Sequence, residues 1–552
     1  MPQEIFTIPK PINEPNLSYA VGTKERDGVK KALSNLRSQI LEIPLIIGGK
    51  PVKTKNIGEC RCPHEHAHLL ATYHNAGENE VEAAIESSLS ARTKWASIDW
   101  TERATVFLKA ADLLAGPWRQ KLNAATMLCQ SKNVFQAEID AACELIDFWR
   151  FNVYYMQQVY LQQPESSRGV LNRTQYRPLE GFIYAVSPFN FTAIGGNLAT
   201  APAIAGNVVV WKPASTAVYS NYLVMKVLSE AGLPDGVINF IPGKSSETGM
   251  IPFLHPQFAG LHFTGSTATF RNMWKVIGEN IERYKNYPRV VGETGGKNFV
   301  FIHSSADLGE VVTALIRGAF EYQGQKCSAA SRLYVPESVW HSLKNQLVSE
   351  IRKVKTGPVE DFLNFVNALI DKAAFDKVKS YIEFARTSSE AEVIIGGECD
   401  DSIGYFVEPT AVVTKNPKFR TMQEEIFGPV LTVYVYPDNS FEETLTLCDE
   451  TSPYGLTGAF FALDRNAIAT AEKLLVNAAG NFYINDKPTG AVVGQQPFGG
   501  ARLSGTNDKS GSMGHMLRWV SQRTIKENLA PIRNWTYPFM AEGRDFGRES
   551  RI

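Results

Sequence analysis

Cys327 lies in the stretch AFEYQGQKCSAASRLYV, residues 319–335. Apolar spacing before it predicts a helix that Gly324 stops, and Ser331–Val335 predicts a strand. The cysteine therefore falls in a loop between helix and strand, where catalytic groups are often carried. A thiolate is the reactive form, and the cation of the neighbouring Lys326 would lower the thiol pKa if its side chain points towards the sulfur rather than away from it. The alternative is a buried, inert cysteine.

Two other stretches carry groups that could act on a carbonyl compound together with a thiol. In VGETGGKNFVF, Glu293 ends a Val-rich strand before two glycines, where partial burial would raise its pKa and suit it to general base catalysis. A salt-bridged glutamate in a turn fits the same pattern. In SPFNFTAIGGN, Asn190 follows the strand GFIYAV, so its amide could donate to a developing oxyanion. An Asn that only supports the turn fits as well.

Two strand ends have the residue types that hold a nucleotide. NVVVWKPAS, residues 207–215, predicts a buried strand ending at Lys212, whose ammonium could reach ribose hydroxyls. HFTGSTATF, residues 262–270, predicts a strand, then Gly265 and Ser266, then a helix whose N-terminus could hold a phosphate. Neither is a GxGxxG fingerprint, and an ordinary turn explains each stretch equally well.

A further stretch, CRCPHEHAH, contains residue types that bind metals. Alternate residues of an extended strand point to one face, and here these are Cys60, Cys62, His64, His66 and His68. Ligands arranged in this way point in parallel and do not converge on one ion, and a proline interrupts them. The sequence therefore favours a solvated, His-rich strand, and no metal is expected.

Strands and helices alternate from Gly181 onward, which predicts a parallel α/β sheet. A second such series begins after Gly296, so two α/β domains are expected. Before them, apolar residues at three- and four-residue steps predict helices at Glu80–Trp95, Thr101–Leu114, Trp118–Cys129 and Ala137–Tyr160. The stretch IPLIIGGKPV, residues 43–52, predicts a short hairpin around two glycines.

Length and composition exclude several classes of protein. A chain of 552 residues needs two or three domains. Lys and Arg number 56 against 57 Asp and Glu, so no basic field attracts nucleic acid. No apolar run reaches the roughly 20 residues of a membrane helix, and the start of the chain has no signal-peptide or transit-peptide pattern. Seven scattered cysteines do not suggest a disulfide framework. We expect an intracellular enzyme in a reducing compartment.

The order of these motifs resembles that of the aldehyde dehydrogenase superfamily. The series runs through Asn190, Lys212, Gly265-Ser266, Glu293, Cys327, the stretch EIFGP at 425–429 and PFGG at 497–500. The resemblance covers nearly the whole chain from about residue 45. Within the superfamily, FNFTAIGGN, FEYQGQKCSA, NFYINDKPTG and VGQQPFGGARLSGTNDK are similar to the members that oxidise L-glutamate γ-semialdehyde.

The resemblance implies a covalent mechanism. Cys327 would attack the aldehyde to form a thiohemiacetal, whose oxyanion Asn190 and the Cys327 backbone N–H would hold. Hydride loss would leave a thioester, and Glu293 would activate the water that hydrolyses it. The expected product is L-glutamate, formed in the second step of proline catabolism. The alternatives are a dehydrogenase for another short aldehyde acid, such as succinate semialdehyde, and a non-catalytic relative.

The resemblance also implies the ligand contacts. NAD would be bound by Lys212 at the adenosine ribose, Gly265 and Ser266 at the pyrophosphate, and Glu425 at the nicotinamide ribose, with Ser187, Pro188 and Phe427 beside them. Phe191 and Phe498 would flank the aliphatic chain of the substrate, and Ser328, Gly490 and Ala491 would hold its polar end. Relatives of this group have a serine at the place of Ala491. Ser215 stands where many NAD-preferring relatives have a glutamate, which leaves NADP as a weaker alternative.

The implied fold has a Rossmann-like NAD-binding domain, an α/β catalytic domain and a small β oligomerisation flap. We expect the NAD-binding domain at residues 1–163 and 181–296, the catalytic domain at 297–486, and the flap at 164–180 and 515–552. The flap would pair two strands and join subunits into a homodimer or a higher homo-oligomer. The expected compartment is the cytoplasm, or the mitochondrial matrix if the source is a eukaryote.

Overall fold

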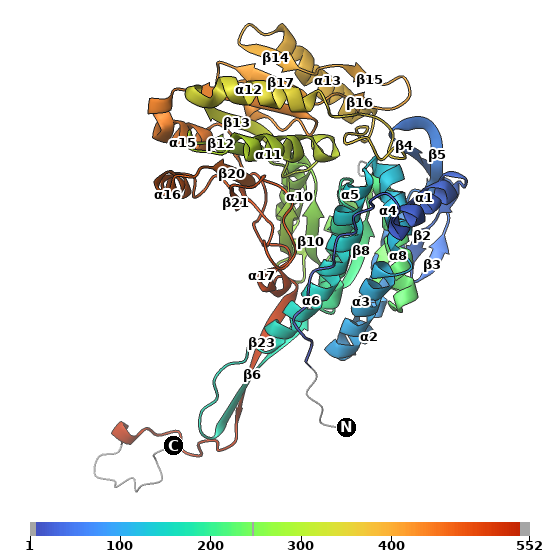
Figure 1. Cartoon of the computed structure of the whole chain (residues 1–552). Helices are drawn as coiled ribbons and strands as arrows, with labels where there is room; N and C mark the ends of the chain where they lie inside the picture. Colours follow the sequence, from blue (N-terminus) through green and yellow to red (C-terminus); the bar gives the residue numbers. More distant parts are fainter. Residues whose placement is uncertain (1–6, 245–247, 541–552) are drawn as a thin grey trace.

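The computed structural model describes residues 7–244 and 248–540. Residues 1–6, 245–247 and 541–552 belong to the expected domain ranges but lie outside the described residues. Two large sheets organise the described chain (Figure 1). The predicted α/β class, with strands and helices alternating around parallel sheets, is confirmed.

The first large sheet has seven strands in the order β11-β10-β7-β8-β9-β2-β3. The five strands β11 to β9 in this order are parallel, and the predicted hairpin at 43–52 forms the antiparallel edge pair β2–β3. Gly48 and Gly49 turn that hairpin with φ of +57° and +74°, which favours glycine. The strands are β2 (Leu45–Ile47), β3 (Lys50–Val52), β7 (Phe182–Val186), β8 (Val208–Lys212), β9 (Ile238–Phe240), β10 (Phe258–Thr264) and β11 (Arg289–Glu293).

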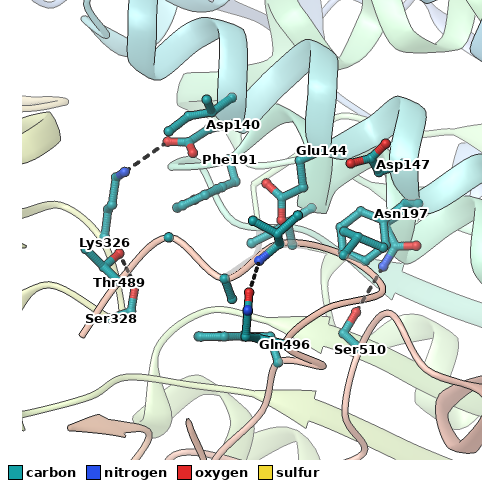
Figure 2. Close-up of a pocket in the computed structure, with 18 of the residues that line it drawn as sticks. Asp140, Glu144, Asp147, Phe191, Asn197, Lys326, Ser328, Thr489, Gln496 and Ser510 are labelled. Atoms are coloured by element: carbon teal, nitrogen blue, oxygen red, sulfur yellow. Dashed lines mark hydrogen bonds and ion pairs between the residues drawn. The ribbon is translucent and has the colours of Figure 1, made fainter. Parts of the chain in front are cut away.

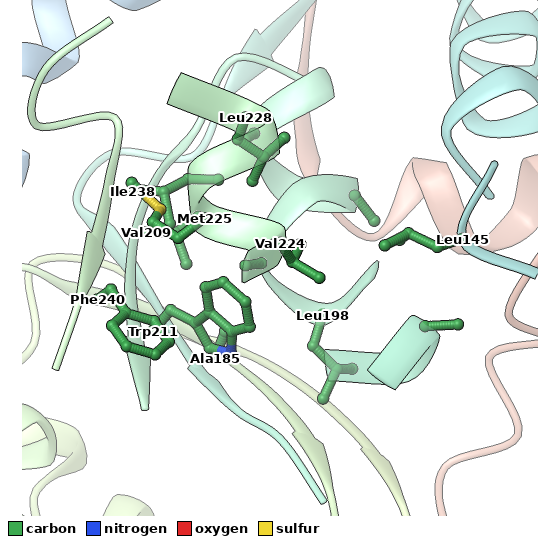
Figure 3. Close-up of a cluster of buried hydrophobic side chains, with 14 of the residues drawn as sticks. Leu145, Ala185, Leu198, Val209, Trp211, Val224, Met225, Leu228, Ile238 and Phe240 are labelled. Carbon is green, nitrogen blue, oxygen red and sulfur yellow. The ribbon is translucent and has the colours of Figure 1, made fainter. Parts of the chain in front are cut away.

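Helices cover both faces of this sheet, so its central strands are buried and mostly apolar. Every residue of β7, β8 and β10 is buried, as expected for parallel strands with both faces covered. Figure 3 shows Trp211 of β8 beside Phe240 of β9, with Val224, Met225 and Leu228 above them. The two rings meet edge to face with centroids 5.1 Å apart. These three apolar residues come from α8 (Val218–Ala231), and α7 (Thr192–Ile204) packs beside it.

The N-terminal third is mostly helical. It contains α1 (Lys24–Arg37), α2 (Glu78–Ser97), α3 (Trp100–Ala115), α4 (Arg119–Gln130), α5 (Val134–Ala137) and α6 (Glu144–Tyr160). The single helix predicted over 137–160 is interrupted by the π-helical turn η1 (Glu138–Cys143). Such turns often occur at functional sites. Here the turn holds the buried Glu138, which pairs with Arg119 of α4.

The second large sheet has the order β14-β17-β18-β13-β12-β20-β21, with all neighbours parallel except β14 and β17. Its strands are β12 (Asn298–Ile302), β13 (Ala330–Pro336), β14 (Ala391–Ile395), β17 (Thr410–Thr414), β18 (Val430–Tyr436), β20 (Thr457–Phe461) and β21 (Asn481–Ile484). Its helices are α11 (Leu308–Phe320), α12 (Glu337–Ile351), α13 (Lys372–Thr387), α14 (Arg420–Gln423), α15 (Phe441–Glu450) and α16 (Arg465–Leu474). Two hydrophobic clusters pack on its opposite faces.

The prediction of one solvated strand at residues 60–68 is wrong. Pro63 lies in the turn between β4 (Ile57–Cys62) and β5 (Glu65–His74), which with β1 (Leu41–Ile43) form a three-stranded sheet. Cys60, Cys62 and His64 are buried, because the hairpin packs against α4. Among the described residues, no group of three or more His, Cys, Asp and Glu side chains is placed to hold a metal ion.

A long two-stranded arm extends away from both sheets (Figure 1). It pairs β6 (Val170–Pro178) with β23 (Val520–Asn528) in nine antiparallel positions. The predicted pairing of the segment near 165–180 with the strand near 523–528 is therefore present. The remaining elements are α10 (Thr267–Glu279), α17 (Met513–Leu517), β15 (Cys399–Asp400), β16 (Phe406–Val407), β19 (Tyr454–Gly455) and β22 (Ala501–Arg502). Within residues 7–244 and 248–540, no helix is long and apolar enough to span a bilayer.

Candidate active site

A cavity of about 590 Å³ lies where the two large sheets meet. Its lining comes from distant parts of the chain, including the N-terminal segment, α6, the end of β11, the loop before β13 and the loop after β21. Seven of the sequence-predicted residues line it, namely Phe191, Glu293, Cys327, Ser328, Gly490, Ala491 and Phe498. The fold therefore brings the thiol, the carboxylate and all five expected substrate contacts to one cavity.

Cys327 is half-buried in the loop between α11 and β13, as its sequence context predicts. The loop begins with the tight turn η5 (Glu321–Gly324), where Tyr322 and Gln323 have φ of +51° and +54°. Non-glycine residues seldom adopt such angles without support from their surroundings. Here the Gln323 amide donates to the carbonyl oxygens of Ser131 and Ala368, at 3.0 and 2.8 Å.

Two glycines allow the loop after β11 to press against the Cys327 loop. A Cβ on Gly296 would lie 2.4 Å from the carbonyl oxygen of Cys327, and a Cβ on Gly295 would lie 2.3 Å from a carboxylate oxygen of Glu425. Real Cβ atoms do not approach so closely, so a side chain at position 296 would clash with backbone, and one at position 295 would displace the Glu425 carboxylate. The Gly296 N–H also donates to Glu425 at 2.9 Å. The loop after β11 thus meets the Cys327 loop through backbone and the Glu425 loop through the Glu425 carboxylate.

Asn298 is a site residue that the sequence analysis missed. Its side-chain amide donates to the carbonyl oxygens of Cys327 and Ala329 at 2.7 and 2.8 Å, and its oxygen accepts from the Thr457 N–H at 3.1 Å. All three partners are backbone groups of neighbouring strands or loops. An asparagine at the start of a buried strand was the available signal, since a buried amide must find such partners.

Of the two orientations open to Lys326, the structure has the one that points away from Cys327, so its cation does not lower the thiol pKa. The Lys326 ammonium lies away from the sulfur, 3.4 Å from Asp140 and 3.8 Å from Glu321. Burial raises the pKa of the Cys327 thiol well above its ordinary value, and the carboxylates of Glu293 and Glu425 add to the rise. In the free protein the thiol is therefore protonated at neutral pH.

Glu293 ends β11 and is half-buried at the cavity wall. Burial raises its pKa to about 8, and the neighbouring Asp508 adds to the rise while the Lys509 ammonium opposes it. The structure therefore has the rise in the Glu293 pKa through burial that the sequence predicts. A carboxyl group with a pKa near the working pH can take up and release a proton.

Asn190 is buried beside the cysteine loop, at the carboxyl end of β7. Its amide donates to the carbonyl oxygen of Gln325 at 3.1 Å, two residues before Cys327. One further N–H of the same amide is available, because an Asn side chain carries two donors. Asn190 itself is not among the residues that line the cavity, whereas its neighbour Phe191 is.

The expected nucleotide contacts gather at the carboxyl edge of the first large sheet. Lys212 ends β8, Ser187 and Pro188 follow β7, and Gly265 and Ser266 follow β10. Lys212 is buried, which lowers its pKa to about 8. Ser266 caps α10 by accepting the Thr269 N–H at 3.2 Å. Ligands of parallel α/β sheets bind at this edge.

Two expected nucleotide contacts come from the loop before β18. Glu425 is half-buried, and burial raises its pKa. Phe427 has a φ of +62° and meets the Phe189 ring edge to face at 5.8 Å. The loop therefore reaches from the second sheet to the segment after β7 in the first.

Hydrogen bonds and ring contacts fix the expected substrate contacts in the cavity wall, and Figure 2 labels Phe191 and Ser328 among them. Ser328 and Thr489 share a hydroxyl hydrogen bond of 2.7 Å, which ties the cysteine loop to the loop after β21. Gly490 follows with a φ of +93°. The Phe191 ring lies under the Lys132 ammonium, 4.2 Å from its centroid, and Phe498 is held by backbone bonds with Ser510 of 3.0 and 2.8 Å.

Three acidic residues line the cavity wall opposite this loop, and the sequence analysis did not single them out. Asp140, Glu144 and Asp147 project from η1 and α6 towards the cavity (Figure 2). Asp140 pairs with Lys132 at 2.6 Å, whereas Glu144 forms no ion pair among the described residues. Burial and the neighbouring Asp140 raise the pKa of Glu144 well above its ordinary value. The helical spacing of the three residues was the available signal.

Comparison with known proteins shows the family. The model of the aldehyde dehydrogenase family matches residues 52–525. A Dictyostelium discoideum protein named delta-1-pyrroline-5-carboxylate dehydrogenase, mitochondrial, is 54% identical over 97% of this chain and 96% of its own length. The human protein of the same name is 50% identical over 96% of this chain and 94% of its own length.

A solved structure gives the same result. The delta-pyrroline-5-carboxylate dehydrogenase of Mycobacterium tuberculosis, bound with NAD, superposes with a TM-score of 0.95 at 50% identity, over 98% of this chain and 100% of that one. The fold and the cavity define an α/β protein with a thiol and a carboxylate at one cleft. The chain belongs to the aldehyde dehydrogenase family, so the predicted family is confirmed.

The raised pKa of the Cys327 thiol determines how its alkylation rate in the free protein should depend on pH. The rate of Cys327 alkylation by iodoacetamide should rise about tenfold per pH unit up to and beyond pH 9, because the thiolate fraction grows in that proportion below the pKa. Peptide mass spectrometry after timed quenching measures the rate at Cys327, with glutathione as the unperturbed thiol. A plateau at Cys327 below pH 9 would contradict the assignment of a raised pKa.

Proposed function

We propose that the chain oxidises L-glutamate γ-semialdehyde, the open form of Δ1-pyrroline-5-carboxylate, to L-glutamate with NAD, the second step of proline catabolism. One observation carries the proposal. Cys327 and Glu293 line a cavity that two aromatic rings and a polar loop also line, and these are groups that an aldehyde with a charged far end would contact. The names of the relatives support the same reaction.

The residues at the sheet edge fit a dinucleotide. The buried Lys212 ammonium forms no ion pair among the described residues, so it is free to bind ribose hydroxyls. The N-terminus of α10, after Gly265 and Ser266, would hold the pyrophosphate. Glu425 would bind the second ribose. NAD, when bound, supplies the acceptor for the hydride that leaves the substrate carbon.

The chain's own residues would carry out the remaining chemistry. The Cys327 thiol first gives its proton to solvent water; its sulfur then adds to the aldehyde carbon, and the C=O π electrons move to the oxygen, which becomes an oxyanion. The Asn190 amide and the Cys327 N–H donate to that oxygen. Once hydride has left, the carbon is a thioester of Cys327. Glu293 takes a proton from water, the hydroxide attacks the thioester carbon, and the released thiolate is ready for another cycle.

The acidic wall supports the choice of an amino acid aldehyde. L-Glutamate γ-semialdehyde carries an α-ammonium and an α-carboxylate at its far end, whereas succinate semialdehyde carries only a carboxylate. The loop at Gly490 and Ala491 offers backbone N–H donors to the carboxylate, with Ser328 nearby. We assign Glu144, half-buried and unpaired on the opposite wall, to the ammonium. A carboxylate alone would leave Glu144 buried without a partner.

A steady-state assay with a panel of aldehydes tests the proposal. We expect kcat/KM for L-glutamate γ-semialdehyde to exceed that for succinate semialdehyde by at least about tenfold, because an unpaired polar group in a site built to bind it is costly. We expect NAD to be preferred to NADP in the same assay. Equal or better turnover of succinate semialdehyde would count against the amino acid substrate.

Two variants test the role of the Cys327 thiol and the role of the Glu293 carboxyl group separately. Cys327→Ala should lose turnover and still bind NAD, as measured by calorimetry.

Glu293→Gln should keep its burst of NADH, and its steady-state rate should fall about 10²–10⁴-fold, because only thioester hydrolysis needs the base. In the wild type, hydrolysis should rise with pH through about 8, since the Glu293 carboxyl must be ionised to accept a proton. A lost burst with fast hydrolysis in Glu293→Gln would refute the assignment.

We assign the first large sheet with its helices to NAD binding, at residues 1–163 and 181–296, and the second to catalysis, at 297–486. Residues 164–180 and 515–552, which include the two strands of the arm, would form the interface of a homodimer.

An isolated two-stranded ribbon is marginally stable, which supports a role of the arm in joining subunits. The arm segment also exposes Leu171 and Leu529, at 49% and 61%. The compartment would be the cytoplasm, or the mitochondrial matrix in a eukaryote.

Placing charge on the arm should break the proposed dimer. We expect Leu171→Glu combined with Leu529→Glu to shift the wild-type dimer towards the 61.2 kDa monomer, because a partner strand would bury these side chains. Sedimentation velocity over a range of concentrations measures the shift. Leu463→Glu, at a position on the body that is 68% exposed, is the matched control. An unchanged dimer in the arm variant would contradict the interface.

A further inference from the structure

The first described residues of the chain form an ordered strap. Residues 7–22, here called the N-terminal strap, contain no helix or strand. Side chains of α4, η1 and α6 hold the strap in place. The Glu14 carboxylate lies between Arg119 of α4 and Arg150 of α6, at 2.5 and 2.7 Å, and the buried Glu138 accepts from the Leu17 N–H and the Tyr19 hydroxyl at 2.8 and 2.7 Å.

The strap reaches the edge of the cavity. Asn13, Glu14, Pro15 and Asn16 line it together with Asp147 of α6 and part of the loop after β21. That loop, residues 485–500 between β21 and β22, is here called the anchor loop, and it contains Gly490 and Ala491. A segment more than 460 residues away in the sequence therefore closes the cavity beside the loop that would hold the polar end of the substrate.

One side chain joins the two walls. The Asn13 amide donates to a carboxylate oxygen of Asp147 at 2.8 Å and to the carbonyl oxygen of Val493 at 2.8 Å, and the Asn13 oxygen accepts from the Gln495 amide at 2.9 Å. The Glu14 N–H donates to the second carboxylate oxygen of Asp147 at 2.8 Å. Asn13 thus uses both donors and its acceptor to connect α6 with the anchor loop.

Few other contacts hold the anchor loop in place. Residues 490–496 are held from within by the Val492 N–H, which donates to the Gln496 side chain at 3.0 Å, and by a turn at Val492–Gln496. Val493 packs against Phe148 and Phe151 of α6. Among the described residues, Asn13 is the one side chain from outside the anchor loop that hydrogen-bonds to residues 490–496.

We propose that Asn13 is a positioning residue for substrate binding. By tying the anchor loop to α6, it sets the distance between the backbone N–H groups near Ala491 and the acidic wall that carries Glu144. The inference rests on the proposed function, in which these two walls bind the two charges of one substrate. Asn13 touches neither the reacting carbon nor the nucleotide edge, so its loss should weaken aldehyde binding and leave nucleotide binding unchanged.

The test compares Asn13→Ala with Ile12→Ala, a neighbouring strap position whose side chain is 86% exposed. We expect Asn13→Ala to raise KM for L-glutamate γ-semialdehyde about tenfold, with kcat changed by less than about twofold and the Kd for NAD unchanged. KM for propionaldehyde, which is too short to reach the anchor loop, should stay the same. Ile12→Ala should match the wild type. An unchanged KM for the semialdehyde in Asn13→Ala would overturn the proposal.

A second readout does not depend on the substrate. Hydrogen exchange should speed up in peptides covering residues 490–496 of Asn13→Ala and not in those of Ile12→Ala, because the loop has lost its outside hydrogen bonds. If the wild type fails to oxidise the semialdehyde while this exchange still speeds up, the proposed function is wrong and the strap contact stands. Unchanged exchange in Asn13→Ala would overturn the positioning role whatever the substrate.

Discussion

The close contact at Gly295 and Gly296 is the constraint on which the site depends. These glycines let the loop after β11 lie against the Cys327 carbonyl, where a Cβ on Gly296 would clash with backbone, and against the Glu425 carboxylate, which a Cβ on Gly295 would displace. The first large sheet, which ends in Glu293, is thereby joined to the second, which presents the thiol. The Glu293 and Cys327 side chains that line the cavity come from the two segments that meet at this point.

Burial sets the charge state of the residues at this junction. The pKa values of Cys327, Glu293 and Glu425 are all raised, because each group would carry negative charge in a region with little water. The nearby lysine that could have eased this, Lys326, is paired with Asp140 instead. In the free protein the Cys327 thiol is therefore protonated at neutral pH, and it must lose that proton before it can act as a nucleophile. This arrangement limits the reactivity of the thiol before substrate arrives.

The cavity wall is assembled from segments that are far apart in the chain. The strap supplies Asn13, α6 supplies Glu144 and Asp147, and the anchor loop supplies Gly490 and Ala491. Hydrogen bonds through Asn13 and between Ser328 and Thr489 lock these segments to each other. Specificity for the far end of a substrate is thus a property of the packing between elements, whereas the chemistry depends on the loops at the strand ends.

Local pattern alone was enough to predict the strands around VVVWK and FAGLHFT, the glycine hairpin at 48–49 and the loop that carries Cys327. Each depends on neighbours in sequence, such as continuous apolar runs or a glycine at a turn. The same reasoning failed at 60–68, where a turn buries Cys62 and His64, and it left open the orientation of Lys326, whose charge is taken by Asp140. It missed Asn13, Glu144 and Asn298 altogether. Their partners lie far away in the chain, and only tertiary packing decides which buried polar groups meet.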